Sequence, residues 1–479
     1  MVVQHNMQAM NASRMLNITT NAQSKSTEKL SSGYRINRAA DDAAGLSISE
    51  KMRKQIKGLD QASTNAEDGV SAVQTAEGAL TEVHSMLQRM NELAVQASNG
   101  TNSESDRSSI QDEIDQLTTE IDRVAETTKF NETYLLKGSN GYKKINIDAH
   151  DAGLEGTLTQ NTTKATFTMA ALSVGDTYSI GGTEYEIGAE DTAAAAKALL
   201  GDDAKDFNSL AEDSVITIDG KSYTIKQNTS AADNEYSAAK IGTLISQGST
   251  IEYNGKSVTL FSEDSVSDED PNNKTLITAD KAYKMVQTEL KAASSIGATI
   301  SSNKLNSTGT AIETTMAKVA DADTKSVEGS VKFVIEKGSN VTSNDLSFAL
   351  HVGADADMTN KIGVKIESMD STSLGIGNIN VSDTTGKAAT YAIDAIADAV
   401  SKVSQQRSAL GAVQNRLEHT IANVDNVVEN TTSAESRIRD TDMADEMVNY
   451  SKNNILAQAG QSMLAQANQS TQGVLSILG

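Results

Sequence analysis

The first 130 residues carry a regular alternation of apolar and polar positions. Apolar residues recur at alternating steps of four and three, with Ser63 filling one gap, at Met52, Ile56, Leu59, Ala66, Val70 and Val73. After a single three-residue irregularity the steps continue at Ala76, Leu80, Val83, Leu87, Met90 and Ala94. Such spacing is typical of a coiled-coil seam. It predicts one helix from about residue 46 to 99, roughly 80 Å long at 1.5 Å per residue, with Gly100 as its stop.

A second helix is predicted directly after this stop. Ser103 is a candidate N-cap with Asp106 three residues later, the spacing of a capping box. Its apolar seam consists of Ile110, Ile114, Leu117, Ile121 and Val124. Because the connection is short, we expect this helix to fold back antiparallel to the first.

The last hundred residues repeat the pattern. A second long seam, interrupted by Arg407, consists of Ile393, Ile396, Val400, Val403, Leu410, Val413, Leu417, Ile421, Val424 and Val427. Neither seam can be buried by its own helix, so we expect the two to pack together. The predicted fold is a mainly α-helical coiled-coil stalk, built from the N- and C-terminal segments, with an inserted α+β region of β-hairpin and helix units.

The middle of the chain has a weak internal repeat. Residues 179–187, 217–225 and 252–260 each place Gly-Gly, Asp-Gly or Asn-Gly between alternating residues, which predicts three tight β-hairpins. Alanine-rich segments near 191–200, 231–246 and 279–297 follow and are predicted to be helices. We place these hairpin–helix units at about 165–300 and a strand-rich part at about 330–370.

The outermost ends are amphipathic but only weakly apolar. The candidate interface residues are Met7, Met10, Leu16, Ile455, Leu456, Met463, Leu464, Val474 and Leu475. Two interpretations are open: frayed chain ends, or helices that become ordered when a partner covers their apolar stripes. Two such ends flanking one coiled coil favour the second interpretation.

Composition and charge exclude several classes of protein. The 479 residues carry a formal net charge of -23, which argues against nucleic acid and anionic membranes as partners. Cysteine is absent, so disulfides and thiolate chemistry are excluded. We find neither the run of about 20 apolar residues that spans a bilayer nor the pattern of a cleavable secretory signal.

Candidate catalytic or metal-binding residues are few. None of the five histidines, His5, His84, His150, His351 and His419, stands in an HExxH motif, and each is expected to be an ordinary helix or surface residue. Asp41 and Asp42 are interpreted as a turn between helices. The sequence therefore predicts no enzyme, no cofactor and no metal site.

Four motifs resemble the signatures of one family. KLSSGYRINRAADDAAGLSIS (Lys29–Ser49) and LQRMNELAVQASNGTNSESDRSSIQDEI (Leu87–Ile114) resemble the N-terminal signature of the bacterial flagellins. RIRDTDMADEM (Arg437–Met447) and ILAQAGQSMLAQANQ (Ile455–Gln469) resemble the C-terminal signature. The similarity covers about residues 1–140 and 385–479.

This resemblance implies a secreted structural subunit of the flagellar filament that serves swimming motility. It implies a filament core of terminal helices (1–45 and 448–479), a coiled-coil stalk (46–145 and 385–447) and variable outer domains (146–384). It also implies type III export, and as partners other flagellin subunits, an export chaperone, and cap and junction proteins. A hook–filament junction protein is the alternative, and an enzyme or adhesin displayed on the filament is a third class.

The resemblance also points to a surface in the stalk. Arg89, Leu93 and Glu113 match the flagellin surface bound by the innate immune receptor Toll-like receptor 5. The simpler interpretation is that Arg89 and Glu113 lie on solvated faces of adjacent helices and form a weak ion pair.

Overall fold

The computed structural model describes residues 6–201, 203–227, 234–263, 266, 268–298, 314–318 and 329–478, and gives no side-chain environment at 314–318 and 471–478. The chain divides into two compact units. We call Met1–Gln74, Phe348–Val364 and Gly411–Gly479 the end unit, and Thr75–Ser347 and Lys365–Leu410 the insert unit.

Two long helices contribute to both units and confirm the predicted coiled coil. They are α2 (Ala43–Ser98) and α8 (Lys387–Arg439). In the end unit, Glu50 forms an ion pair with Arg439 at 2.9 Å and Ser63 donates a hydrogen bond to Asp425 at 2.9 Å. In the insert unit, Arg407, which interrupts the predicted seam, lies 3.6 Å from Glu77. Partner numbers rise on one helix as they fall on the other, so the helices are antiparallel.

The predicted seam is buried to different depths in the two units. In the insert unit every seam position of α2 from Ala76 to Ala94 is buried. In the end unit Met52, Ile56 and Leu59 are half-buried, and Val427 of α8 is 41% exposed. Fewer elements pack around α2 in the end unit, so its apolar stripe stays partly open to water.

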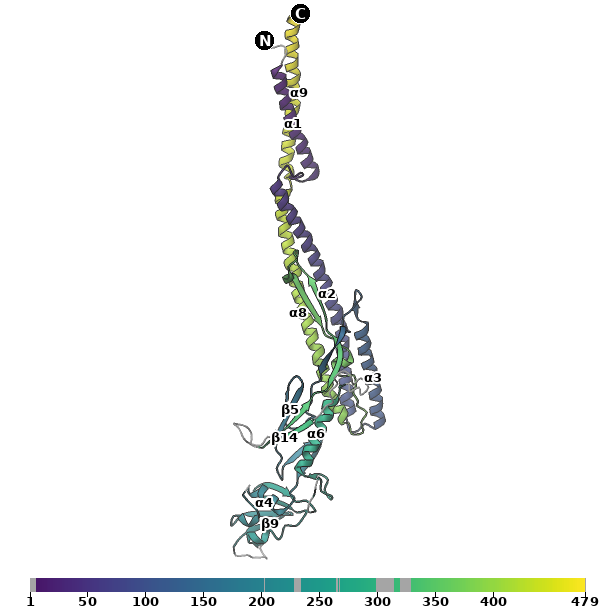
Figure 1. Cartoon of the computed structure of the whole chain (residues 1–479), viewed down its shortest axis with the longest axis vertical. Coiled ribbons are helices and arrows are strands. Elements are labelled where there is room, and N and C mark those ends of the chain that lie inside the picture. The colour runs from purple at the N-terminus through teal and green to yellow at the C-terminus, as the bar shows by residue number, and fades with distance from the viewer. Residues whose placement is uncertain are drawn as a thin grey trace. The chain divides into compact units, whose positions relative to one another are not determined.

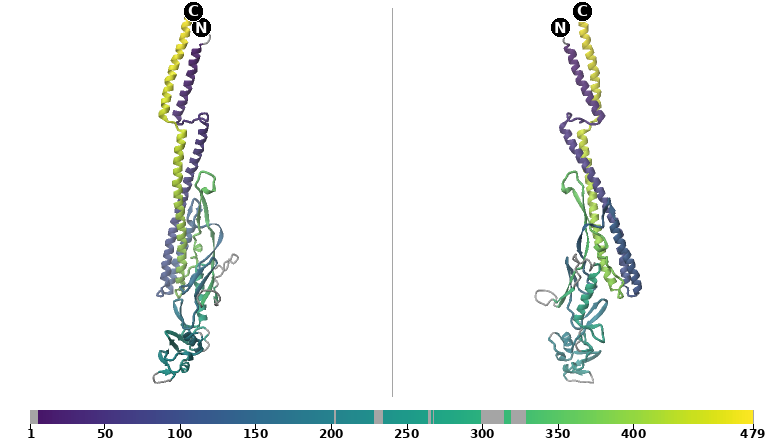
Figure 2. Two further views of the ribbon diagram at one scale, coloured as in Figure 1. Left: turned by 90° about the vertical axis from the view of Figure 1, so that its left-hand side faces the viewer. Right: turned by 45° about the vertical axis from the view of Figure 1, so that its right-hand side comes forward.

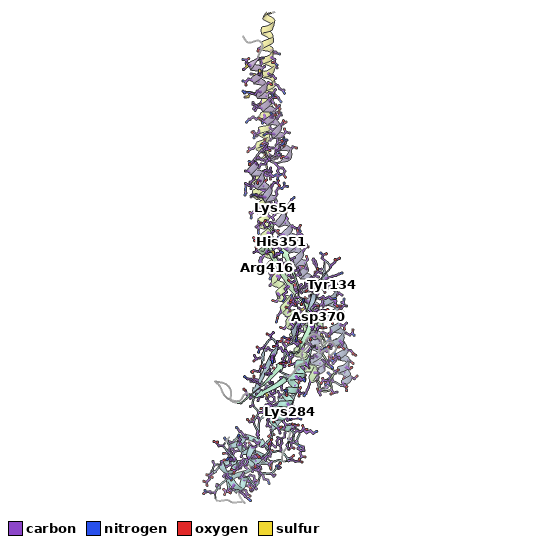
Figure 3. The ribbon with its side chains drawn as sticks, viewed as in Figure 1. Lys54, Tyr134, Lys284, His351, Asp370 and Arg416 are labelled. Atoms are coloured by element: carbon purple, nitrogen blue, oxygen red, sulfur yellow. The ribbon has the colours of Figure 1, made fainter. Side chains whose placement is uncertain are left out.

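A β-hairpin covers one side of the helix pair in the end unit. It consists of β17 (Leu346–His351) and β18 (Lys361–Ile366), with the 3-10 turn η2 (Met358–Asn360) before β18. Ala66, Ile362 and Leu417 form a small core between the hairpin and the helices. The backbone carbonyl of His351, labelled in Figure 3, accepts a hydrogen bond from Asn65 at 3.0 Å. A Cβ at Gly69 would lie 2.1 Å from the Cδ1 atom of Leu350, so the hairpin approaches α2 closely at this glycine.

The helix predicted after Gly100 is α3 (Glu104–Thr127). Ser103 and Asp106 form the expected capping box. Arg107 donates to the carbonyl of Ala97, and Arg89 pairs with Glu113, so α3 runs antiparallel to the second half of α2, as predicted. The two helices lie side by side in Figures 1 and 2.

All three glycine hairpins of the middle region are confirmed. They are β6–β7 (Thr177–Ile180, Thr183–Ile187), β8–β9 (Val215–Ile218, Lys221–Ile225) and β11–β12 (Thr250–Tyr253, Lys256–Thr259). Both turn residues have positive φ in each hairpin: Gly181 and Gly182, Asp219 and Gly220, Asn254 and Gly255. Strands β8, β9, β11 and β12 join β10 (Glu235–Tyr236) in a five-stranded sheet, whereas β6 and β7 pair with β13 (Leu276–Ile277).

The alanine-rich segments are confirmed in two cases out of three. The first and third form α4 (Thr192–Leu200) and α6 (Ala279–Ser295). The prediction of a helix at 231–246 is wrong for its described part. There β10 pairs with β9, and a four-residue helix, α5 (Ala238–Ile241), follows. The ring of Tyr236 packs edge-on against Tyr223 with centroids 5.7 Å apart, so sheet packing overrides the local helix preference.

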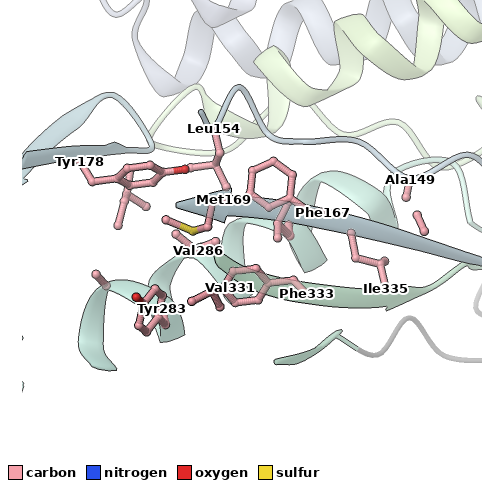
Figure 4. Packing of buried hydrophobic residues seen from close by; sticks show 14 of the residues in the cluster. Ala149, Leu154, Phe167, Met169, Tyr178, Tyr283, Val286, Val331, Phe333 and Ile335 are labelled. Atoms are coloured by element: carbon pink, nitrogen blue, oxygen red, sulfur yellow. The ribbon is translucent and has the colours of Figure 1, made fainter. Parts of the chain in front are cut away.

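A four-stranded sheet forms part of one hydrophobic core of the insert unit. Its order is β14 (Thr314–Lys318), β15 (Ser330–Glu336), β5 (Lys164–Ala170) and β4 (Thr157–Gln160). Phe167 and Phe333 are fully buried, with ring centroids 6.4 Å apart, and the ring of Tyr283 on α6 lies 6.3 Å from that of Phe333 (Figure 4). The predicted strand-rich part is confirmed by β15 through β18.

The insert unit also contains several short elements. They are β1 (Lys129–Phe130) and β2 (Thr133–Tyr134), β3 (Ser139–Asn146) paired with β16 (Ser339–Asn344), the turn η1 (Phe207–Ser209), and α7 (Ser371–Leu374). Among the described residues, no helix combines the length and the apolarity that crossing a membrane requires.

Candidate assembly surface

The N-terminal segment forms one well-delimited helix. In α1 (Met7–Ser32) the side chain of Asn6 accepts the backbone N–H of Ala9 as the N-cap. Gly33 adopts φ 76° and its N–H bonds to the carbonyl of Lys29, which ends the helix. Residues 34–42 then lead into α2, where Asp42 accepts the N–H of Gly45 at 2.8 Å. The interpretation of Asp41 and Asp42 as a turn is therefore confirmed.

This turn is fastened to the other end of the chain. Arg35 donates its backbone N–H to the carbonyl of Arg439 at 2.7 Å, and Thr441 donates to Gly33 at 3.0 Å. The Arg439 guanidinium lies 4.7 Å from the centre of the Tyr34 ring. Helix α9 (Met443–Leu478) begins directly after this contact. The two chain ends therefore leave the coiled coil at the same level.

Helices α1 and α9 lie side by side (Figures 1 and 2), a pairing that the sequence did not lead us to expect. Lys29 and Glu446 form an ion pair at 3.6 Å, and Asn6 donates to the carbonyl of Ala467 at 3.1 Å. Leu16 faces Gly460, where an added Cβ would lie 3.3 Å from the leucine side chain.

The contact between these helices buries very little. Of the side chains described in α1 and α9, only Ser26 and Ala457 are buried. Neither is large and Ser26 is polar, so the pair gains little hydrophobic stabilisation from burial. In the second half of α2, by contrast, Leu80, Val83, Leu87 and Met90 are fully buried.

Most of the apolar stripe of both helices therefore faces water. Leu16 and Leu464 are half-buried between the helices. Ten large apolar side chains are exposed: Met7, Met10, Met15 and Ile18 of α1, and Met443, Met447, Val448, Ile455, Leu456 and Met463 of α9. We call these ten residues the terminal apolar surface. The side chains of Val474 and Leu475 lie outside the described residues.

A shallow groove follows this surface on α9. It is lined by Ala444, Met447, Val448, Ser451, Lys452, Ile455 and Leu456. An exposed apolar face of this kind is typical of a site where a protein, a ligand or a membrane surface binds.

The predicted receptor surface is only partly exposed. Arg89 donates to Glu113 at 2.9 Å and to Glu92 at 3.1 Å. These bonds, led by the one that Arg89 donates to Glu113, raise the pKa of Arg89. Leu93, however, is 1% exposed and belongs to the packed face of α2. The structure thus brings Arg89 and Glu113 together and removes Leu93 from the surface.

Four of the five histidines lie in the part of the chain that the structure describes. Among the described residues, no group of three or more His, Asp and Glu side chains is placed to hold a metal ion. His150 is largely buried 3.8 Å from Asp398, a carboxyl whose pKa burial raises. His5 lies outside the described residues.

Together these features define a class: a largely α-helical structural protein whose paired terminal helices leave apolar faces exposed. Models of the bacterial flagellin N-terminal and C-terminal helical regions match residues 3–141 and 393–478. A flagellin of Clostridium tyrobutyricum is 41% identical over 98% of this chain and 100% of its own length. A flagellin of Halalkalibacterium halodurans is 34% identical over 100% of both chains. The chain belongs to the bacterial flagellin family and is a structural subunit of the flagellar filament.

The solved structures that match this chain include a junction protein. The match to the flagellar junction protein FlgL of Legionella pneumophila covers 82% of this chain and 99% of that protein at 14% identity, with a TM-score of 0.30. Full-length identity to flagellins makes a junction protein the weaker alternative.

Proposed function

We propose that copies of this chain join through the terminal apolar surface when the filament grows. The observation that carries the proposal is the set of ten exposed large apolar side chains on α1 and α9. A neighbouring subunit that covered them would remove this surface from water. Fully burying one such side chain contributes about 1.5–3 kcal/mol, so covering all ten contributes on the order of 15–30 kcal/mol toward assembly.

The geometry of the polymer follows because every subunit carries the same terminal apolar surface. Contacts between different faces of identical subunits are heterologous. They form a closed ring only if the rotation from one subunit to the next adds up to a full turn without a rise along the axis. An open helical polymer results. We propose that residues 1–45 and 448–479 form its core, that 46–145 and 385–447 form the coiled-coil shell, and that 146–384 form the outer domains.

We further propose that the chain acts outside the cell. Its relatives are flagellins, which supports an extracellular filament, delivery by the flagellar type III apparatus, and an export chaperone, cap and junction proteins as partners. We propose no catalytic role for the outer domains, in whose described residues no metal-binding group is found.

Self-polymerisation of the purified chain tests the proposal. We expect the full-length protein alone to form long helical filaments visible by electron microscopy once seeded with filament fragments. Proteolysis is expected to trim both ends of the monomer and to spare them in the filament. A chain that stays monomeric with seeds, or forms only short caps on flagellin seeds, would instead indicate a junction protein.

We also propose that the exposed pair Arg89–Glu113 is a contact for Toll-like receptor 5. The intact motif around it and the exposure of both side chains support this, whereas the buried Leu93 would act by holding α2 in place. We expect Arg89→Ala to weaken monomer binding to the receptor ectodomain at least tenfold. Arg123→Ala, which removes an exposed, ion-paired arginine of α3, is the matched control. Equal binding by the wild type and both variants would exclude the contact.

A further inference from the structure

The terminal apolar surface is unusually rich in methionine. Six of its ten members are methionines: Met7, Met10, Met15, Met443, Met447 and Met463. Among the nine exposed large apolar residues elsewhere in the described chain, Met358 alone is a methionine. Leucine has nearly the same volume and a better-defined packing preference, so burial in a polymer does not by itself require sulfur.

Methionine differs from leucine in one reaction. A two-electron oxidant such as hydrogen peroxide transfers one oxygen atom to the thioether sulfur, which loses two electrons while the peroxide is reduced to water. The product is a sulfoxide, a polar group with a strong hydrogen-bond acceptor. Exposure governs the reaction, and these six side chains are between 51% and 71% exposed.

We propose that peroxide-class oxidants switch off assembly by converting the methionines of the terminal apolar surface to sulfoxides. This inference rests on the proposed function, since it concerns the surface through which copies join. A sulfoxide oxygen carried into a subunit contact would meet apolar neighbours and lose its bond to water. Free subunits are therefore the vulnerable form, whereas subunits already in a filament have the same sulfurs shielded.

The chain contains its own internal references. Met90, Met169 and Met369 are buried in the single chain and are expected to stay unoxidised in monomer and filament alike. Met358, 73% exposed on the hairpin before β18, is the exposed reference outside the surface. Peptide mass spectrometry can follow each of these residues separately.

The test uses full-length monomer treated with hydrogen peroxide until the six methionines are sulfoxides. The critical concentration for seeded polymerisation is then measured by sedimentation. We expect it to rise at least tenfold, and to return on treatment with methionine sulfoxide reductase. A variant with all six positions changed from Met to Leu is the matched control, and peroxide is expected to leave its critical concentration unchanged.

The outcomes separate the two proposals. If untreated wild-type protein does not polymerise, the proposed function fails. If it polymerises and the fully sulfoxidised monomer polymerises equally well, the function stands and the oxidation switch is wrong. A six-leucine variant that loses assembly on peroxide treatment would also overturn the switch, because the damage would lie elsewhere. If the six leucines themselves impair assembly, the decisive measurement is made on the wild type. A critical concentration that the reductase does not restore after peroxide treatment would then overturn the switch.

Discussion

The double substitution Ile455→Glu and Met463→Glu is expected to abolish filament formation without destabilising the single chain. Both side chains belong to the terminal apolar surface and are 67% and 64% exposed, so the monomer loses no buried contact. In the polymer each change removes about 1.5–3 kcal/mol of burial and adds a carboxylate with no partner. At 1.4 kcal/mol per tenfold change, we expect the critical concentration to rise by more than about a hundredfold.

The control for this prediction is Val215→Glu. Val215 is 52% exposed on β8. This strand belongs to the proposed outer domains, outside the proposed filament core. Its critical concentration is expected to match the wild type by sedimentation, and both proteins are expected to keep the wild-type thermal unfolding midpoint. Normal filaments from the double variant would contradict the role of the terminal apolar surface.

Arg107→Ala is expected to have the largest effect on folding. The Arg107 side chain is buried and donates to four backbone carbonyls: Ala97 at 2.9 Å, Thr384 at 3.2 Å, and Asn99 and Asp383 at 3.4 Å. Its positive charge lies at the C-terminal end of α2, where the helix dipole is negative. It thereby joins the α2–α3 turn to the segment that enters α8. Leaving these carbonyls without their donor costs about 3 kcal/mol of unfolding free energy.

Two further variants test whether the lost unfolding free energy is due to removal of the buried guanidinium. Arg107→Lys keeps the charge but lacks the planar fork of donors, so we expect an intermediate loss of stability. Arg123→Ala removes an exposed arginine of the same helix, and we expect no measurable change. The measurement is denaturant unfolding followed by helical circular dichroism. Equal stability of Arg107→Ala and Arg123→Ala would contradict this interpretation.

The sequence was informative wherever a short-range pattern determined the structure. The four-and-three alternation predicted α2, α3 and α8 because a helix that packs on one side must repeat its apolar residues at that spacing. The Gly-Gly, Asp-Gly and Asn-Gly pairs predicted the three hairpins, since both turn residues need positive φ. These features depend on neighbouring residues along the chain.

Predictions failed where tertiary packing decided the structure. The seam positions of α2 by themselves mark only a narrow stripe of that helix. Where α3 packs against α2 as predicted, the buried stripe is wider than the seam and includes Leu93 and Ala97. For this reason Leu93, assigned to the receptor surface from resemblance, is buried. Likewise, the paired rings of Tyr223 and Tyr236 place a strand where alanines favoured a helix.

The pairing of α1 with α9 was missed for a different reason. Its buried side chains are Ser26 and Ala457, which leave no apolar periodicity in the sequence. The same small contact explains why the terminal helices are suited to assembly. A pair that buries so little opens at a small free-energy cost, whereas the exposed methionines and Ile455 gain much from a neighbour.

Hydrogen exchange on monomer and filament tests the central claim most directly. Amides of Met7–Ser32 and of residues 443–470 should exchange rapidly in the dilute full-length monomer, while amides of residues 76–97 in α2 serve as the protected reference. In the filament we expect protection of both ends to rise by at least about a hundredfold. Ends that are as strongly protected in the lone monomer as in the filament would contradict the account.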